Sequence, residues 1–357
     1  MAQARTRSAD SLTVAVLGAS GYAGSEVLRL CAAHPRFDVV VATGDRSAGR
    51  LVGRHTASLS AAYPDLVLEG NEPASIAERV DGVDVLFSAL PHGRSQRLLP
   101  DLVDRVGAVV DLAADFRLRD PAAYARWYGE EHACPELLDR FAYGLPELFR
   151  SELVGARLVA APGCYPTAAS LALAPLVRAG LVDEHGVPVV VDAASGVSGA
   201  GRAAKDDLHF AEVDGDFRAY GLLGHRHTAE MEQALGVPVL FTPHLAPMVR
   251  GILATAYVRP AAEGRQPTSE ELTDVLREHY RGEPFVVVDD DPPSTKSTAG
   301  TNVVRLTARS DPRTGWLLVL AAIDNLVKGA AGQAVQCANL ATGQPETAGL
   351  PLAGLYP

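Results

Sequence analysis

Short apolar runs alternate with segments of helical spacing over roughly the first 160 residues. The runs occupy residues 12–17, 37–42, 84–90 and 108–112. A run that is apolar at every position is typical of a strand buried on both faces, as in a parallel sheet. The segment between the first two runs, residues 25–33, has apolar residues at helical spacing. The pattern therefore predicts a parallel α/β domain up to residue 163.

Beyond residue 163 the pattern changes, because few helices separate the later apolar runs. These runs lie at residues 187–192, 237–241, 251–258, 284–288, 303–308 and 316–322. One predicted helix, residues 268–280, opens with a capping box formed by Thr268 and Glu271. A second predicted helix covers residues 325–340. This arrangement predicts a second domain of α+β type around a mixed, largely antiparallel sheet.

Composition and charge exclude several classes of protein and partner. The 357 residues suffice for two domains, and 47% hydrophobic with 21% charged residues is typical of a soluble globular protein. A net charge of −11 argues against a nucleic-acid partner. No run approaches the ~20 apolar residues of a membrane helix. The four cysteines are far apart in the sequence, which fits neither a zinc site nor a disulfide framework and favours a cytoplasmic protein.

A glycine-rich turn follows the first apolar run directly and precedes a helical segment. Strand, glycine turn and helix in this order indicate a Rossmann-type dinucleotide site, although the spacing is GxxGxxG where GxGxxG is usual. A purely structural turn is the alternative. The predicted cofactor-binding residues here are Gly18, Ala19, Ser20, Gly21, Tyr22, Ala23 and Gly24.

The loop after the second run bears on the choice of cofactor. It begins with Thr43, and Arg46 and Ser47 are suited to bind a 2′-phosphate, which favours NADP. Asp45 is the competing candidate, because an acid at this point could accept hydrogen bonds from the ribose of NAD. A solvated loop arginine is the plain alternative for Arg46.

Loops at the carboxyl ends of parallel strands bind ligands in this kind of sheet. The third run ends in such a loop, and we expect its residues to pass along the nicotinamide side: Ser88, Ala89, Leu90 and Pro91. His92 follows, as a functional residue or a helix cap. Arg117, after the fourth run, is a candidate anion ligand or else a surface ion-pair partner.

Cys164 lies between a Pro-Gly turn and an apolar segment, residues 168–177, that is expected to be a helix. Pro166 and Thr167 suit the first positions of that helix. A cysteine at a helix N-terminus is favoured as a thiolate, which is the nucleophilic form. A small buried cysteine behind the turn is the alternative.

A second glycine-rich loop spans residues 195–202, and a basic cluster follows it. The loop offers Ser195 and Gly196 to a cofactor, and Ser198, Arg202 and Lys205 to phosphate or carboxylate groups of a substrate.

The basic cluster contains His225 and His227, and a histidine here can act as a general acid/base beside Cys164. The pair could also be two metal ligands, but no third ligand stands at a recognisable spacing, so no metal is predicted.

Several stretches together resemble the N-acetyl-γ-glutamyl-phosphate reductases. They are GASGYAG at 18–24, PHG at 91–93, AYGLPE at 142–147, PGCYPTA at 162–168, SGVSGAGR at 195–202, GHRHTAEM at 224–231, PHLAPMVRG at 243–251 and ETAGLPLAGLYP at 346–357. The resemblance covers nearly the whole chain.

The resemblance implies an NADPH-dependent enzyme of arginine biosynthesis. In its reaction Cys164 forms a thioester with the acyl phosphate, which is then reduced to N-acetylglutamate 5-semialdehyde. It further implies His225 as the acid/base, with His227 remaining open, and Asn325 as a nicotinamide contact. It places residues 325–357 with the first domain (1–163), leaving 164–324 as the catalytic and oligomerisation domain of a homo-oligomer.

Two rival functions remain at this point. One is the same chemistry on a carrier-protein-linked aminoadipyl or glutamyl phosphate in lysine biosynthesis. The charge of −11 disfavours an acidic carrier protein and so favours a small-molecule substrate. The other is a non-catalytic NADP-binding regulator, against which Cys164 and the two histidines together argue.

Overall fold

The structure is a computed structural model that describes residues 10–183, 189–261 and 265–355. By the density of contacts between Cα atoms the chain forms two compact units. The first contains residues up to 124, 130–162 and 330–350, and the second contains 125–129, 163–329 and the residues from 351 onwards. The functional domain boundaries expected from the sequence remain a prediction.

The first unit is built on a seven-stranded sheet in the order β3-β2-β1-β4-β5-β7-β6, and every strand pair in it is parallel. Its strands are β1 (Leu12–Leu17), β2 (Phe37–Thr43), β3 (Leu68–Glu69), β4 (Val85–Ser88), β5 (Ala108–Asp111), β6 (Ala142–Tyr143) and β7 (Leu158–Ala160). Its helices are α1 (Tyr22–Ala33), α2 (Val52–His55), α3 (Pro73–Arg79), α4 (Ser95–Leu98), α6 (Pro146–Leu153) and α11 (Gly332–Ala341), and α5 (Pro121–Tyr128) ends in the second unit.

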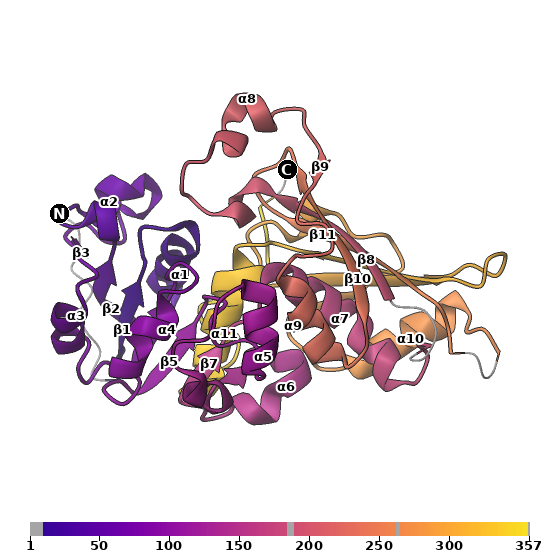
Figure 1. Cartoon of the computed structure of the whole chain (residues 1–357), viewed down its shortest axis with the longest axis horizontal. Coiled ribbons are helices and arrows are strands. Elements are labelled where there is room, and N and C mark those ends of the chain that lie inside the picture. Colours follow the sequence, from indigo (N-terminus) through magenta and orange to yellow (C-terminus); the bar gives the residue numbers. More distant parts are fainter. Residues whose placement is uncertain (1–9, 184–188, 262–264, 356–357) are drawn as a thin grey trace. The chain divides into compact units, whose positions relative to one another are not determined.

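Both faces of this sheet are covered, as the continuous apolar runs predict. Ala15 and Leu17 of β1 belong to a cluster that includes Ile76 of α3 and Leu98 of α4. The opposite face of β1 is also fully buried, and α1 and α11 contact each other while packing on the neighbouring strands. Figure 1 shows this layered arrangement of helices around the sheet. The predicted Rossmann-type α/β domain is confirmed.

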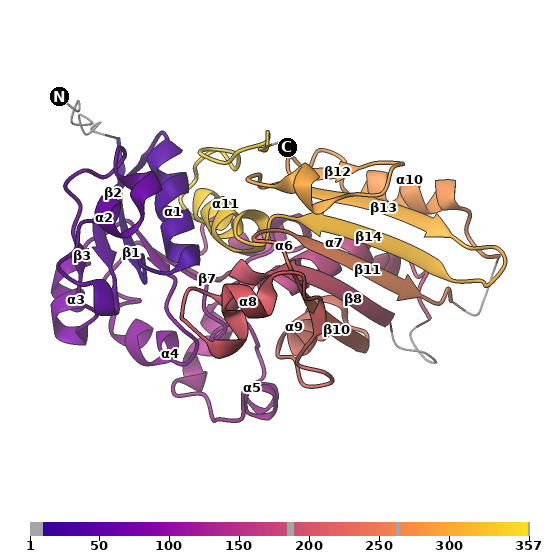
Figure 2. The ribbon, with the colours of Figure 1, turned by 90° about the horizontal axis from the view of Figure 1, so that it is seen from above.

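The second unit contains another seven-stranded sheet, in the order β12-β13-β14-β11-β8-β10-β9. Most neighbours are antiparallel, while the β8–β10 and β12–β13 pairs are parallel, so the predicted mixed sheet is confirmed. Its strands are β8 (Val189–Gly196), β9 (Arg218–Ala219), β10 (Val239–Ala246), β11 (Ile252–Val258), β12 (Val286–Val288), β13 (Val304–Ser310) and β14 (Leu317–Ile323). Figure 2 shows β13, β14, β11 and β8 side by side.

Helices cover only one face of this second sheet among the described residues. Helices α7 (Cys164–Arg178), α9 (His227–Leu235) and α10 (Ser269–His279) pack on it, whereas the short α8 (Phe210–Val213) belongs to an exposed segment. Figure 1 shows the three longer helices on the same side of the strands. Helix α10 has the capping box expected at Thr268 and Glu271.

Three local expectations differ from the structure. The strand predicted at 237–241 extends further than expected, because β10 continues alongside β8 through Pro243 and His244 to Ala246. Ser195 and Gly196 are likewise the last residues of β8. The helix expected over 325–340 begins with a π-helical turn, Val327–Ala331, before α11. The first residues of the strand expected at 187–192 lie outside the described residues.

Candidate active site

Cys164 is the first residue of α7, and Gly163 is the residue that caps the helix. The sequence predicted this position, and the structure confirms it. The amide groups of the first helical turn have no partner within the helix, and together with the helix dipole they favour negative charge at this end. The thiol is partly exposed, whereas the other three cysteines of the chain are buried. Cys164 therefore combines accessibility with a site that stabilises a thiolate.

His227 lies against the turn that carries Cys164. A Cβ atom added at Gly163 would stand 2.4 Å from Nε2 of His227, so the imidazole occupies the space of a side chain at position 163. His227 is also the first residue of α9, and its side chain is 19% exposed. The structure thus brings together the nucleophile and one of the two predicted histidines.

Glu230 connects His227 with the same turn. Its carboxylate is fully buried, accepts a hydrogen bond from the Gly163 N–H at 2.9 Å, and has its other oxygen 3.9 Å from Nε2 of His227. One buried carboxylate therefore holds the residue before the nucleophile and faces the imidazole.

His225 has a different environment. Its ring makes edge contacts with Tyr165, Tyr220 and Phe241, and its Nδ1 accepts the His227 N–H at 3.2 Å. Burial, followed by the charge of Arg226, lowers the pKa of His225 to about 4. His225 is therefore neutral near pH 7.

The π-helical turn also contacts the nucleophile. A Cβ atom at Gly329 would stand 2.7 Å from Cβ of Cys164, so only glycine fits there without a shift. The Gly329 N–H donates to the Asp324 carbonyl, five residues back. Such turns recur at functional sites because they redirect a helix locally.

Asn325 is buried, and its side chain bridges two segments. Its Oδ1 accepts the Gly251 N–H at 2.8 Å, and its Nδ2 donates to the Ser198 hydroxyl at 2.9 Å. Ser195 is buried, with its hydroxyl donating to the Gly196 carbonyl. Asn325 therefore braces the second glycine-rich loop. Arg202 and Lys205 of the same region are exposed.

In the first unit the glycine-rich turn forms the cradle that a dinucleotide needs. Gly18 has φ +73°, and a Cβ there would stand 2.4 Å from the Ala89 carbonyl oxygen at the end of β4. A Cβ at Gly24 would stand 2.3 Å from the Gly18 carbonyl oxygen, so helix and turn approach more closely than side chains permit. Thr43 supports the turn, because its hydroxyl accepts the Gly18 N–H at 3.0 Å. These contacts fit a pyrophosphate at the N-terminus of α1.

Residues 45–47 form one short 3-10 turn after β2. Asp45 and Arg46 are both exposed in this turn, and Ser47 is buried. Both candidates for the ribose end of a dinucleotide thus stand side by side: Asp45 as an acceptor for ribose hydroxyls and Arg46 as a ligand for a 2′-phosphate.

Ser88 ends β4 and is fully buried, so its hydroxyl contacts other protein groups and not solvent. It lies 2.8 Å from the Ser95 hydroxyl, which donates to Asp111 at 2.8 Å. The following loop residues, Leu90 and Pro91, are buried and exposed respectively.

His92 has Nδ1 2.7 Å from Asp115 and Nε2 3.5 Å from Glu130. It therefore contacts two acidic side chains within the first unit. Arg117 is 8% exposed and donates to the Leu112 carbonyl at 2.7 Å, which does not fit the surface ion pair considered for it.

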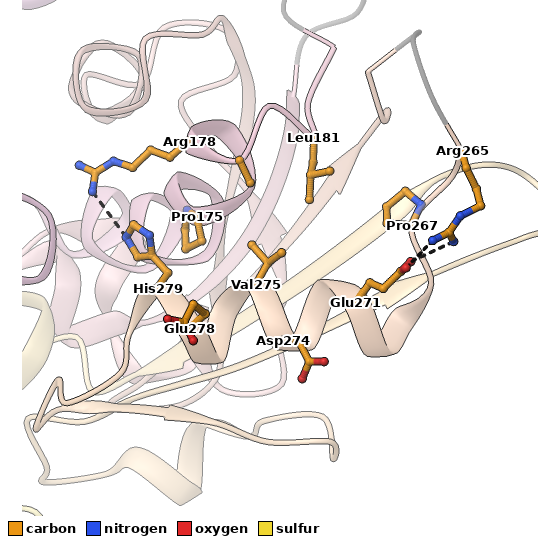
Figure 3. A pocket seen from close by; sticks show the side chains of 11 residues that line it. Pro175, Arg178, Leu181, Arg265, Pro267, Glu271, Asp274, Val275, Glu278 and His279 are labelled. Carbon is orange, nitrogen blue, oxygen red and sulfur yellow. Dashed lines mark hydrogen bonds and ion pairs between the residues drawn. The ribbon is translucent and has the colours of Figure 1, made fainter.

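Within residues 10–183, 189–261 and 265–355, no cluster of three or more histidine, cysteine or acidic side chains could hold a metal ion. No helix in the same ranges is long and apolar enough to cross a membrane. A hollow of about 730 Å³ lies elsewhere in the second unit, between α7 and α10, beside Pro175, Val275 and His279. Figure 3 shows that Arg178 points toward His279 there. None of the predicted site residues lines this hollow.

Three residues of these sites were not identified from the sequence: Glu230, Gly329 and Asp111. The only sequence signals were an acidic residue three positions after His227, a glycine in an apolar helix, and an acid closing an apolar strand. None of these signals is specific.

Known proteins with similar sequences and folds match nearly the whole chain. Residues 13–156 match the family model described as semialdehyde dehydrogenase, NAD binding domain, and residues 164–325 match that described as semialdehyde dehydrogenase, dimerisation domain. The chain is 49% identical to an N-acetyl-gamma-glutamyl-phosphate reductase of Symbiobacterium thermophilum, over 97% of this chain and 100% of the relative. It is 48% identical to the protein of that name from Desulforudis audaxviator, with the same coverage.

Solved structures support the fold. Aspartate semialdehyde dehydrogenase II from Vibrio cholerae, complexed with ASA, superposes with a TM-score of 0.69 at 18% identity, covering 93% of this chain and 98% of that chain. Aspartate semialdehyde dehydrogenase with NADP from Candida albicans superposes with a TM-score of 0.68 at 17% identity, with the same coverage. At this level of identity the likeness shows the fold alone.

Proposed function

Because the chain belongs to the N-acetyl-γ-glutamyl-phosphate reductase family, we propose that it reduces N-acetyl-γ-glutamyl phosphate to N-acetylglutamate 5-semialdehyde in arginine biosynthesis. The observation that carries this proposal is Cys164 at the N-terminus of α7, with His227 and Glu230 against its turn. This arrangement suits acyl transfer to sulfur. The nicotinamide dinucleotide supplies the hydride when bound, and the glycine turn of the first unit would hold it.

Cys164 is the proposed nucleophile. Its thiolate attacks the acyl carbon, the C–O bond to phosphate breaks, and phosphate departs. A thioester between Cys164 and the acyl group remains on the enzyme. Addition of hydride to the thioester carbonyl gives a tetrahedral oxyanion, which takes a proton. Loss of that proton with cleavage of the C–S bond then releases the aldehyde and restores the thiolate. The helix N-terminus favours the thiolate at the start and at the end of this sequence.

His227 is the proposed group that gives and takes this proton. The contact of its imidazole with Gly163 and the facing Glu230 carboxylate support this role. The family resemblance instead implies His225 as the acid/base. Its low pKa and its contacts with three aromatic rings suit a neutral supporting residue that orients His227 through the backbone.

NADP is the proposed form of the cofactor. Arg46 is exposed beside the buried Ser47 in the turn after β2, where a 2′-phosphate would meet a cation and a hydroxyl-bearing turn. The competing Asp45 in the same turn would favour NAD. Phosphate and carboxylate groups of the substrate are proposed to bind to Ser198, Arg202 and Lys205 of the second unit. Arg117 of the first unit is proposed separately as an anion ligand.

A homo-oligomer formed through the second sheet is also proposed. The face of that sheet away from α7, α9 and α10 includes the half-exposed Val190, Leu240, Leu253, Tyr257 and Leu318, which are neighbours across β8, β10, β11 and β14. An apolar surface of this kind is typical of a protein interface. The name of the matching family model, a dimerisation domain, supports this proposal.

The functional domains are proposed to be residues 1–163 with 325–357 for the dinucleotide, and 164–324 for catalysis and oligomerisation. A cytoplasmic location is also proposed, because the widely spaced cysteines fit a reducing compartment.

The decisive experiment follows the reverse reaction of the purified protein. N-Acetylglutamate 5-semialdehyde, phosphate and NADP⁺ should yield NADPH, with NAD⁺ and aspartate semialdehyde as parallel controls. Turnover should require phosphate and disappear in Cys164→Ser. Activity with NAD⁺ alone would shift the cofactor assignment to Asp45, and dinucleotide binding without any turnover would exclude this reaction and favour the carrier-linked substrate or the regulator.

A further inference from the structure

Asp111 is a fully buried acid that the proposed reaction does not use. It closes β5, and its Oδ1 accepts hydrogen bonds from the Ser95 hydroxyl at 2.8 Å and from the Ala113 N–H at 3.2 Å. Its Oδ2 is buried and has no hydrogen-bond partner among the described residues. A buried carboxylate with an unused oxygen is costly as an anion, so the site favours the protonated acid.

The hydrogen bonds of Asp111 lead in one direction, toward the dinucleotide cradle. Ser95 has a single hydroxyl proton and donates it to Asp111, so the proton between Ser88 and Ser95 comes from Ser88. Ser88 ends β4, and the next residue, Ala89, donates its N–H to the Leu17 carbonyl. The carbonyl of Ala89 packs directly against Gly18, since a Cβ added at Gly18 would stand 2.4 Å from its oxygen. Asp111 is thus connected through two hydroxyls to the strand end that supports the glycine turn.

The charged group that acts on Asp111 is Asp115, in the loop after β5. Burial first, and then the charge of Asp115, raise the pKa of Asp111 to about 7. Asp115 is itself fully buried and is compensated by His92 at 2.7 Å and by the N–H groups of Gly93 and Gln96. The adjacent strand β7 and helix α11 contain no charged residue, and Arg97 of α4 is exposed.

We propose that Asp111 is a positioning residue for the dinucleotide site, whose proton, acting through Ser95 and Ser88, determines how tightly the glycine turn holds the cofactor. The neutral acid adds no buried negative charge behind the turn. The anion adds such a charge behind a site for a pyrophosphate, and it pulls the two hydroxyls toward itself. Dinucleotide affinity should therefore fall as the pH rises through neutrality, by roughly fivefold.

Binding of NADPH, and separately of NADH, to the full chain tests this proposal. Cofactor fluorescence would be titrated between about pH 6 and about pH 8.5, a range that spans the transition of Asp111. Asp111→Asn keeps an acceptor for Ser95 but has no proton to lose, so it should bind NADH with the low-pH affinity of the wild type at every pH. Asp104→Asn, on the exposed surface of the same unit, should retain the wild-type profile.

The two cofactors separate this inference from the proposed cofactor preference. The 2′-phosphate of NADPH titrates in the same range, whereas NADH lacks it, so a loss of the transition with NADH in Asp111→Asn would support the inference. If Asp111→Asn instead bound the dinucleotide more weakly by the same factor at every pH and kept the transition, Asp111 would have only a structural role. That result would overturn the inference. The inference rests on dinucleotide binding and needs no turnover.

Infrared difference spectroscopy of the wild type provides a second measurement that does not depend on the folding of the variant. A buried protonated carboxyl band should be present near pH 6 and should disappear with a midpoint near 7, and Ser95→Ala should shift that band. Absence of the band at low pH would overturn the proposal.

Discussion

The imidazole of His227 fills the space beside Gly163 that a side chain at that position would need, since an added Cβ would stand 2.4 Å from Nε2. Gly163 is extended, with φ −69° and ψ 157°, a conformation open to any residue. The glycine is therefore required by the histidine and not by the backbone.

Gly163→Ala should leave the fold intact but displace His227 from Cys164. Because a misplacement of about 1 Å costs roughly 100-fold in rate, we expect a loss of that order in kcat/KM with little change in Tm. Gly70→Ala is the matched control, since nothing lies within 4 Å of a Cβ there. Full activity of Gly163→Ala would contradict the assigned role of His227.

Cys164 should react with iodoacetamide well below pH 8.5, the region in which an ordinary thiol ionises. Burial raises the pKa of Cys31 to about 12, and burial with nearby acids raises that of Cys134 to about 12, so these thiols should stay unlabelled in the folded protein. Mass spectrometry of peptides across a pH series would measure the reaction at each cysteine. Labelling of Cys164 that rises only near pH 8.5 would show that the helix does not activate it.

Replacement of the two histidines should lower the rate to different extents. His227→Gln should lower kcat by about 10²–10⁴-fold, because the proton carrier is lost. His225 is neutral near pH 7, its pKa being about 4, so His225→Gln should lower kcat by less. A larger loss of kcat in His225→Gln than in His227→Gln would reverse the two roles.

Asp111 should make the first unit less stable at alkaline pH. Its pKa is raised by burial from 3.8 to about 7, so the folded state binds more protons than the unfolded state between these values. Stability therefore falls as the pH rises above about 4, and the loss levels off above the folded pKa at a maximum of roughly 4 kcal/mol. Denaturant unfolding should show this slope in the wild type and a flatter one in Asp111→Asn. Parallel slopes would indicate that Asp111 has an ordinary pKa.

A charge on the open face of the second sheet should separate the subunits. Leu240 is 41% exposed and Tyr257 42% exposed on neighbouring regions of that face. Leu240→Arg or Tyr257→Glu should shift the mass measured by light scattering toward the monomer, because a buried unpaired charge is costly at an interface. Val154→Glu, at an exposed position of the first unit, is the control. A wild-type mass for both interface variants would place the interface elsewhere.

The sequence predicted the parts of the fold that depend on local chemistry. The continuous apolar runs determined the parallel sheet, because strands buried on both faces leave no polar position. The start of α7 at Cys164 followed from the Pro-Gly turn before it and from Pro166 in its first turn. The strand-turn-helix order around Gly18 likewise predicted the cradle.

Other features depend on partners distant in the sequence. Proline lacks a ladder donor, yet β10 continues through Pro243 beyond the apolar run at 237–241, with β8 on one side and only the two-residue β9 on the other. Helix α9 has no Ser, Thr, Asp or Asn cap, so its start at His227 was not recognised. The role of Glu230 depends on the turn at Gly163, 67 residues earlier, which no local pattern reveals.

The burial of helix α7 determines how rarely the backbone that carries Cys164 opens to solvent. Its residues from Tyr165 to Leu176 are buried, so their amide hydrogens should exchange with solvent only when the whole unit opens. The reacting sulfur is therefore carried by one of the slowest-exchanging segments of the chain. We expect the movements that admit substrate and release product in more exposed segments instead, such as the stretch from residue 201 to 224.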